Sequence, residues 1–288
     1  MRNKVGPFTL YTKKPCDIQY GCLYYMETKL PVPFYARRTV RVYLPENYDT
    51  KKKYPVIYMS DGQNIVDKYT SAYGAWDIDV EQHKLCQEGY PQYIVVGIDC
   101  PYGPIERSVE YSFPFAILRY QGLEKRVKRD EKGNLVYTSH LLFKYIVEVL
   151  KPLVDKYFAT SPKFEDTACA GSSMGGVFAL SLLTSYPKVF GAAFCFSPAY
   201  FLYRSSFVDS YMNRVFDSIK DNHKFYFYCG GIGYEHRFIK DTVRMYNYLK
   251  DKGIDEKRLA LSLDENGEHN EPTWNRHFNE AIRFWFDK

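Results

Sequence analysis

Short strand-like segments alternate with longer helix-like segments along most of this 288-residue chain. The strand-like segments are rich in apolar residues and end at turn residues, whereas the helix-like segments repeat apolar residues three or four positions apart. The strand-like segments are 22–29, 39–44, 56–60, 93–98, 168–171, 192–196, 224–229 and 259–263, and the helix-like segments are 76–88, 139–157, 174–186, 208–219, 236–252 and 272–286. This alternation predicts an α/β fold, in which a mostly parallel central sheet carries helices on both faces.

The N-terminal part departs from this alternation, because no helix-like segment separates 22–29 from 39–44. Strands joined without a crossover helix pair antiparallel, so we expect an antiparallel N-terminal edge of the sheet. No linker rich in Pro, Gly or Ser and no internal repeat divides the sequence. We therefore expect a single domain over residues 1–288, which is long enough to bury a sizeable core.

Charge and hydropathy exclude several classes of partner. The net charge of +5 is small for this length, and the basic residues are dispersed apart from the loop-like runs 51–53 and 124–132. No basic stripe alternates with stacking aromatic residues, so we expect no nucleic acid partner. No apolar run is long enough to span a membrane, and residues 1–7 lack the apolar core of a secretory signal. The sequence thus predicts a cytoplasmic protein without a membrane partner and leaves a homo-oligomer open.

The cysteines favour free thiols over a disulfide framework. Their number, seven, is odd, and Cys169, Cys195 and Cys229 lie in strand-like segments. Buried free cysteine behaves as a small apolar residue. No CxxC or His/Cys spacing indicates zinc, so we expect no metal.

Residues 171–176 (GSSMGG) match the pattern G-x-S-x-G and lie between a strand-like and a helix-like segment. In a nucleophile elbow, a serine sits on a sharp strand-to-helix turn with its hydroxyl exposed. Small flanking residues let the strand and the helix approach closely, and the helix N-terminus offers free N–H groups to developing negative charge. The pattern predicts Ser173 as a nucleophile, although a Gly/Ser loop that only joins a strand to a helix fits the five residues equally well.

The positions of other polar residues favour the nucleophile. In an open parallel sheet, ligands bind beyond the carboxyl ends of the strands. Several polar residues follow predicted strands and should meet at that edge: Asp61, Gln63, Asp99, Ser173, Ser197, Glu235 and His269.

A serine nucleophile needs a base and an acid that orients the base, in the chain order Ser, acid, His for this elbow. His269 lies in a polar loop after the last strand, where the base is expected, and His277 is the weaker alternative. Glu235 is the first carboxylate after strand 224–229, but it also suits the N-terminus of the next helix. The remaining candidates for the acid are Asp241, Asp264 and Glu265.

The negative charge that forms on the substrate oxygen must meet fixed hydrogen-bond donors. The backbone N–H of Met174, directly after the nucleophile, supplies the first donor. The second is expected from the loop after strand 56–60, and we assign it to the backbone N–H of Gln63.

Five segments resemble the esterase D-like "putative esterase" group of α/β-hydrolases, which includes feruloyl and acetylxylan esterases, siderophore esterases and mycolyltransferases. They are 54–63 (YPVIYMSDGQ), 96–99 (VGID) followed by Arg107, Glu110 and Tyr111, 171–176 (GSSMGG), 186–191 (YPKVFG) with 196–199 (FSPA), and 267–271 (GEHNE) with Trp274. The resemblance covers about residues 35–287. This chain departs from the group at the acid, because relatives often place the carboxylate about two residues earlier, where this chain has Gly233.

The resemblance implies a serine hydrolase without metal or organic cofactor that cleaves carboxylic esters, including acetyl or feruloyl esters of carbohydrates, through an acyl-enzyme. Its partner is then a small-molecule or oligosaccharide ester. Acyl transfer to a sugar or alcohol, or a silent carbohydrate-binding role, stays open. Arg107, Glu110, Tyr111 and Trp274 are expected to line the pocket, with a structural ion pair and a packed tyrosine as the alternative for Arg107, Glu110 and Tyr111. A pocket wall or lid is also expected from segment 101–138 and from Tyr102, Phe113, Phe115, Tyr120, Tyr200, Phe201 and Tyr203, unless these pack in the core.

Overall fold

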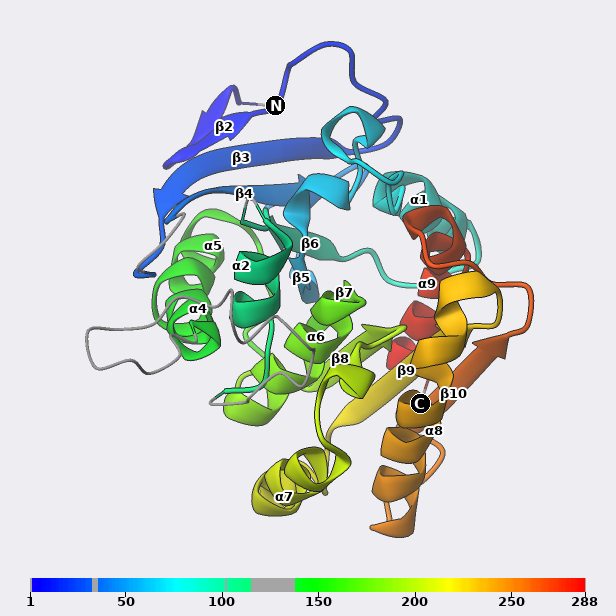
Figure 1. Cartoon of the computed structure of the whole chain (residues 1–288). Coiled ribbons are helices and arrows are strands. Elements are labelled where there is room, and N and C mark those ends of the chain that lie inside the picture. Colours follow the sequence, from blue (N-terminus) through cyan, green and yellow to red (C-terminus); the bar gives the residue numbers. More distant parts are fainter. Residues whose placement is uncertain (1, 33–35, 102, 115–137, 288) are drawn as a thin grey trace.

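The computed structural model of the chain describes residues 2–32, 36–101, 103–114 and 138–287. Within these residues, ten strands form one sheet in the order β1-β2-β3-β4-β6-β5-β7-β8-β9-β10 (Figure 1). The strands are β1 (Lys4–Val5), β2 (Phe8–Leu10), β3 (Cys22–Lys29), β4 (Arg37–Leu44), β5 (Val56–Ser60), β6 (Ile94–Ile98), β7 (Thr167–Ser172), β8 (Ala192–Phe196), β9 (Lys224–Gly230) and β10 (Leu259–Asp264).

Strands β6, β5, β7, β8, β9 and β10 run parallel, and β1 to β4 form an antiparallel edge that joins them through β4 and β6. Every residue of β5, β6, β7 and β8 is buried, as expected for strands covered on both faces. The predicted α/β fold with an antiparallel N-terminal edge is therefore confirmed.

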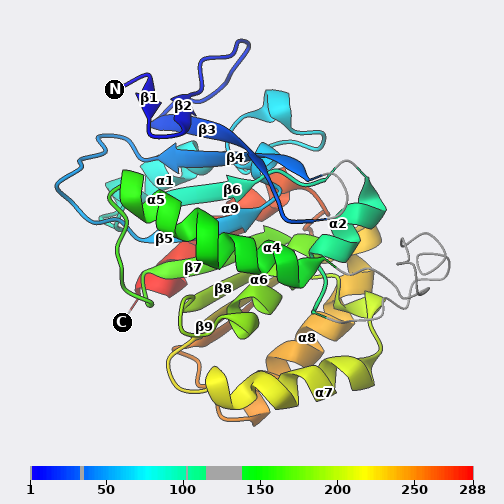
Figure 2. The same cartoon turned by 90° about the vertical axis from the view of Figure 1, so that its left-hand side faces the viewer.

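Helices cover both faces of the sheet. Figure 2 shows α4, α5 and α7 in front of the sheet and α1 and α9 behind it. Apolar residues of α4 to α8 form one core layer, and those of α1 and α9 form the other. The helices are α1 (Ile78–Gln87), α2 (Pro104–Glu110), α4 (Ser139–Tyr145), α5 (Lys151–Tyr157), α6 (Met174–Ser185), α7 (Ser205–Val215), α8 (His236–Asp251) and α9 (Glu271–Phe286).

The sequence places the predicted elements to within a few residues, and the differences have local causes. Strands β1 and β2 and helix α2 were not predicted, because segments of two to seven residues are too short to show a period. The predicted helix 139–157 divides into α4, a π-helical turn (Ile146–Leu150) and α5. Pro152 lies at this point, and a proline ring removes the N–H that a regular α-helix would use.

The predicted free thiols are confirmed, because all seven cysteines lie in described positions and none forms a disulfide. Among the described helices, none is long and apolar enough to cross a membrane.

Candidate active site

Ser173 occupies the turn between β7 and α6 with φ 60° and ψ −119°. A positive φ is rare for residues other than glycine and is held only where the surroundings fix it. Here the Ser173 N–H donates to the Phe196 carbonyl at 2.9 Å, and the Ser173 carbonyl accepts from the N–H of Gly176 at 3.1 Å and of Ala199 at 3.0 Å. These bonds to β8 and α6 hold the strained geometry of a nucleophile elbow.

Gly171 and Gly175 allow the strand and the helix of the elbow to touch. A Cβ at Gly171 would lie 2.6 Å from the Gly175 carbonyl oxygen and would also meet the Ser60 hydroxyl. We expect Gly171→Ala to lower the free energy of unfolding by about 1–3 kcal/mol, because the backbone cannot move away from the added methyl group. Urea denaturation measures the change, with Ser185→Ala at the far end of α6 as the control. An unchanged midpoint for Gly171→Ala would contradict this packing.

The loop after β10 places His269 in contact with Glu235, the residue directly before α8. His269 Nδ1 is 3.0 Å from Glu235 Oε1, and the glutamate side chain is fully buried. Ser197, which follows β8 with φ 41°, donates its hydroxyl to the same Oε1 at 2.6 Å and accepts the Trp274 Nε1–H at 3.0 Å. The glutamate oxygen that faces the histidine is thus fixed from a second side, and Phe238 stacks on the imidazole with ring centroids 4.5 Å apart.

Ser173 and His269 line one pocket of about 510 Å³. Gln63, Arg107 and Trp274 line the same pocket, so the structure brings most of the predicted site residues together. A cavity of this size lies within the usual range for small-molecule sites. The catalytic roles of these residues stay predictions.

Of the two expected oxyanion donors, Met174 directly follows Ser173 and Gln63 lines the same pocket as Ser173. Met174 is the first residue of α6, where helix geometry leaves N–H groups without a carbonyl partner inside the helix. Gln63 lies in a short 3-10 helix (Gly62–Asn64) after β5, and its side chain is tied to Cys100, whose N–H donates to Gln63 Oε1 at 3.0 Å. The left-handed backbone of Asp61, with φ 54° and ψ 51°, produces the turn that leads into this segment.

Arg107 and Asp61 form an ion pair that the sequence did not predict. Arg107 Nε and Nη2 lie 2.7 and 2.8 Å from the two carboxylate oxygens of Asp61, and Nη2 also lies 3.4 Å from the Ser172 carbonyl oxygen. Burial and the Asp61 charge act in opposite directions on the guanidinium, and the charge prevails, so the pKa of Arg107 is raised. The pair fixes the Arg107 guanidinium at the pocket that Ser173 lines.

Glu110 and Tyr111 differ from the prediction that they line the pocket. Glu110 is buried and forms an ion pair with Arg38 of β4, and burial raises its pKa to about 7. The Tyr111 hydroxyl accepts the Asp61 N–H at 3.2 Å, and its ring packs against Phe178 of α6. Both residues match the structural alternative, because α2 turns them toward the core and leaves Arg107 at the pocket.

Other candidates lie apart from the pocket. Asp264 and Glu280 both contact His277, at 3.1 and 2.9 Å, and form a separate cluster on α9 and β10. Asp241 faces Arg244, 3.7 Å away. Phe113, Tyr200 and Tyr203 are buried among aromatic side chains, which agrees with the alternative that they pack in the core. Tyr102, Phe115 and Tyr120 lie outside the described residues.

Within the described ranges, no three or more His, Cys, Asp or Glu gather as metal ligands do.

Glu271, at the start of α9, is a pocket residue that sequence reasoning missed, although it lies two positions after His269 in the same loop motif. It is buried and accepts a hydrogen bond from Asn64 Nδ2 at 2.7 Å. Burial raises the pKa of its carboxyl from 4.5 to about 7, and the Asp61 charge adds to the effect, while Arg107 opposes it.

The raised pKa of the Glu271 carboxyl should make the stability of the fold depend on pH. Because the folded chain binds this proton more tightly than the unfolded chain, the free energy of unfolding contains a contribution from Glu271 that is lost as the pH rises from about 4.5 to about 7. Glu271→Gln should therefore gain stability relative to the wild type across this window, by at most roughly 1.4 kcal/mol per pH unit. Urea titrations at several pH values measure the gain. Glu110 is present in both the wild type and the variant, so its contribution cancels from the difference in the free energy of unfolding. Glu268→Gln, at an exposed position, is the control. A constant difference between variant and wild type would refute the assignment.

The sequence is similar to those of a wider group of proteins. Residues 34–225 match the family described as "Putative esterase". The uncharacterized protein YbbA of Bacillus subtilis (strain 168) is 22% identical over 262 residues, which cover 88% of this chain and 94% of YbbA.

Solved structures share the fold. The BES protein from Bacillus cereus superposes with a TM-score of 0.69 at 18% identity, over 95% of this chain and 99% of its own. The siderophore hydrolase EstA from Aspergillus nidulans superposes with a TM-score of 0.64 at 14% identity, over 95% and 97%. Because the family match extends over more than half of the sequence, the chain belongs to the "Putative esterase" family and is a carboxylic ester hydrolase with the α/β-hydrolase fold.

Proposed function

We propose that the chain is a serine esterase that cleaves its substrate through an acyl-enzyme on Ser173. The observation that supports this most directly is the shared pocket, in which a strained serine and a histidine paired with a buried glutamate line the same cavity. In this arrangement Nδ1 of His269 donates to Glu235, which leaves Nε2 as the nitrogen that accepts the serine proton.

The proposed reaction has two halves. Ser173 Oγ attacks the ester carbonyl carbon as His269 Nε2 takes the hydroxyl proton, and the tetrahedral intermediate collapses when the same nitrogen returns the proton to the departing alcohol oxygen. Water then attacks the acyl-enzyme with His269 as base, and the acid leaves as Ser173 recovers its proton. In both halves the carbonyl oxygen carries negative charge, which the N–H groups of Met174 and Gln63 are proposed to stabilise.

We propose small-molecule or oligosaccharide esters as substrates, with acetyl or feruloyl esters of carbohydrates as the first to test. Polar side chains such as Gln63, Asn64 and Thr70 line the pocket together with Trp274 and the exposed Tyr73, and they offer both hydrogen bonds and aromatic surface. The siderophore hydrolase that shares the fold adds siderophore esters to the panel.

A fluorophosphonate probe and an ester panel test the proposal. We expect covalent labelling of Ser173, located by peptide mass spectrometry, and hydrolysis of at least one of the acetyl, feruloyl and siderophore esters. A chain that is not labelled and hydrolyses none of them would be a silent member of the fold. If added alcohols capture most of the acyl group in preference to water, the activity is acyl transfer.

A further inference from the structure

A second pocket, of about 460 Å³, adjoins the pocket of Ser173 on the side away from His269. We call it the polar pocket; its charged side chains are Glu27, Arg37, Arg38, Arg41 and Asp99, and Thr39 adds a hydroxyl group. Gln63, Thr70 and Cys100 line both pockets, so the two cavities meet at the segment that is proposed to hold the substrate oxygen.

The sheet order decides which part of an ester can enter the polar pocket. The strands run β4-β6-β5-β7-β8-β9-β10, so Asp99 after β6 and Gln63 after β5 lie on one side of Ser173, which follows β7. Glu235 and His269 follow β9 and β10 on the other side. The departing alcohol must be next to His269 to receive its proton. The acyl group is therefore the part that extends past Gln63.

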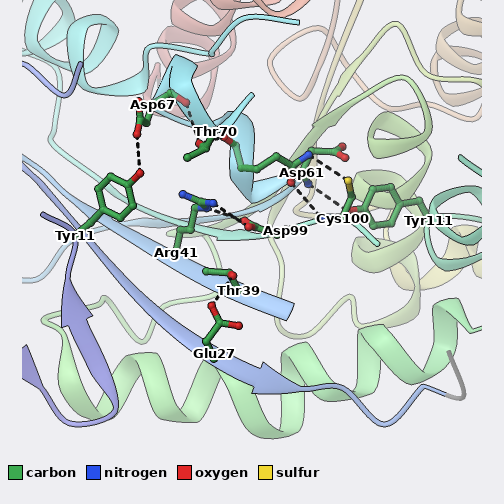
Figure 3. A network of polar contacts seen from close by, with 11 residues as sticks. Tyr11, Glu27, Thr39, Arg41, Asp61, Asp67, Thr70, Asp99, Cys100 and Tyr111 are labelled. Atoms are coloured by element: carbon green, nitrogen blue, oxygen red, sulfur yellow. Dashed lines mark hydrogen bonds and ion pairs between the residues drawn. The ribbon is translucent and has the colours of Figure 1, made fainter. Parts of the chain in front are cut away.

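Arg41 and Asp99 form a fixed polar group in this pocket (Figure 3). Arg41 Nε and Nη2 donate to the two oxygens of Asp99 at 2.7 and 2.9 Å, and the Arg41 side chain is 9% exposed. These two contacts do not use Nη1 of Arg41, which can donate to another acceptor. Each carboxylate oxygen of Asp99 likewise keeps a second lone pair that can accept a hydrogen bond. A hydroxyl group both donates and accepts, so it can use both members of the pair.

The charges that line the polar pocket favour an uncharged ligand. Arg41 is paired with Asp99, and Arg38 is paired with Glu110. Arg37 and Glu27 are exposed, carry opposite charges, and project from neighbouring strands. Thr39 donates its hydroxyl to Glu27 Oε1 at 2.9 Å, as Figure 3 shows beside Arg41. The pocket is thus rich in hydrogen-bonding groups but close to neutral, which suits neither an alkyl chain nor an anion.

We propose that the polar pocket receives the acyl group of the ester and that the Arg41–Asp99 pair selects acyl groups with a distal hydroxyl. This inference rests on the proposed serine esterase activity and specifies which part of the substrate is recognised, and where. Because the acyl group stays attached to Ser173 after the alcohol has left, the contact persists through both halves of the reaction.

Two matched series of substrates test the inference: para-nitrophenyl alkanoates of increasing chain length, and the corresponding ω-hydroxyalkanoates. For the wild type, we expect kcat/KM to favour the hydroxylated ester by roughly 10- to 100-fold, as for a hydrogen bond to a charged group. The preference should begin only at chain lengths that reach past Gln63. Stopped-flow measurement of the deacylation phase should show the same preference.

Variants test whether the Arg41–Asp99 pair causes the preference for the hydroxylated ester. Arg41→Gln/Asp99→Asn keeps a polar side chain at both positions and leaves no unpaired charge, and it should remove most of the hydroxyl preference. The matched control is Arg283→Gln/Glu88→Gln, which removes a similar two-pronged pair on the exposed surface and should leave the preference unchanged. If the first double variant does not fold, Arg41→Lys keeps the positive charge beside Asp99 but lacks Nη1, and it should reduce the preference several-fold.

Three results would overturn the inference: a wild-type preference for the unsubstituted ester, a stronger preference for an ω-carboxyalkanoate, or a hydroxyl preference that survives in the Arg41→Gln/Asp99→Asn variant. Each of them requires that the wild type hydrolyses para-nitrophenyl acetate and is labelled at Ser173. A wild type that does neither would instead refute the serine esterase proposal, so the two failures are distinguishable.

Discussion

Replacing Ser173 by alanine is expected to lower kcat for para-nitrophenyl acetate by roughly 10⁴- to 10⁶-fold. The substitution removes the oxygen that forms the acyl-enzyme, and the remaining turnover would come from binding and the oxyanion donors alone. The backbone bonds of Ser173 to Phe196, Gly176 and Ala199 do not involve its side chain, so the elbow should persist. Steady-state kinetics and the loss of fluorophosphonate labelling measure the effect.

Ser185→Ala is the control for this prediction, because Ser185 ends the same helix that Ser173 precedes. It should keep both turnover and labelling. Circular dichroism of Ser173→Ala should match the wild type, so that the loss reports chemistry and not folding. If Ser173→Ala retains turnover within tenfold of the wild type, the acyl-enzyme mechanism is wrong.

The fold was predictable from sequence because its signals are local. Runs such as 56–60 and 192–196 are continuous, apolar and bounded by turns, and the structure has them as β5 and β8 with the same limits. Helix α8 begins at His236 as predicted, directly after the short segment that carries Glu235. Periodicity and turn residues act over a few positions, so a single sequence contains them in full.

The pairing of side chains across the fold was not predictable in the same way. Asp61 and Arg107 are 46 positions apart, and Arg38 and Glu110 are 72 apart. Which of Arg107, Glu110 and Tyr111 faces the pocket depends on the rotation of α2, a helix too short to show an apolar face in the sequence. Ser197 was expected at the correct sheet edge from its place after a strand, but its bond to Glu235 depends on three-dimensional packing.

The choice of the acid that orients His269 depended both on local sequence signals and on contacts between distant residues. The sequence favoured Glu235, the first carboxylate after strand 224–229, and kept Asp241, Asp264 and Glu265 as further candidates. The structure places Glu235 against His269 at 3.0 Å and Asp264 against His277 at 3.1 Å, so two of the candidate acids contact a histidine at a similar distance. Of the two histidines, His269 lines the pocket of Ser173 and His277 does not. Proximity to the nucleophile, which no sequence spacing encodes, makes Glu235 the candidate that we test.

Glu235→Gln is expected to lower kcat by roughly 10²- to 10⁴-fold with a small change in KM. The amide keeps the size of the side chain and its contact with Ser197, but it can present an N–H to His269 and favour the tautomer in which Nε2 is protonated and unable to act as base. The negative charge that stabilises the imidazolium during the reaction is also lost. The loss should appear in both acylation and deacylation, because His269 transfers a proton in each half.

Asp264→Asn is the matched control, because it makes the same chemical change in the pair with His277, outside the pocket. It should leave kcat within a factor of about two of the wild type, since surface substitutions away from a site have small effects. Thermal unfolding of both variants separates lost stability from lost chemistry. The reverse pattern, in which Asp264→Asn is slow and Glu235→Gln is not, would assign the orienting role to the other carboxylate, and equal small effects would mean that His269 works without an acid partner.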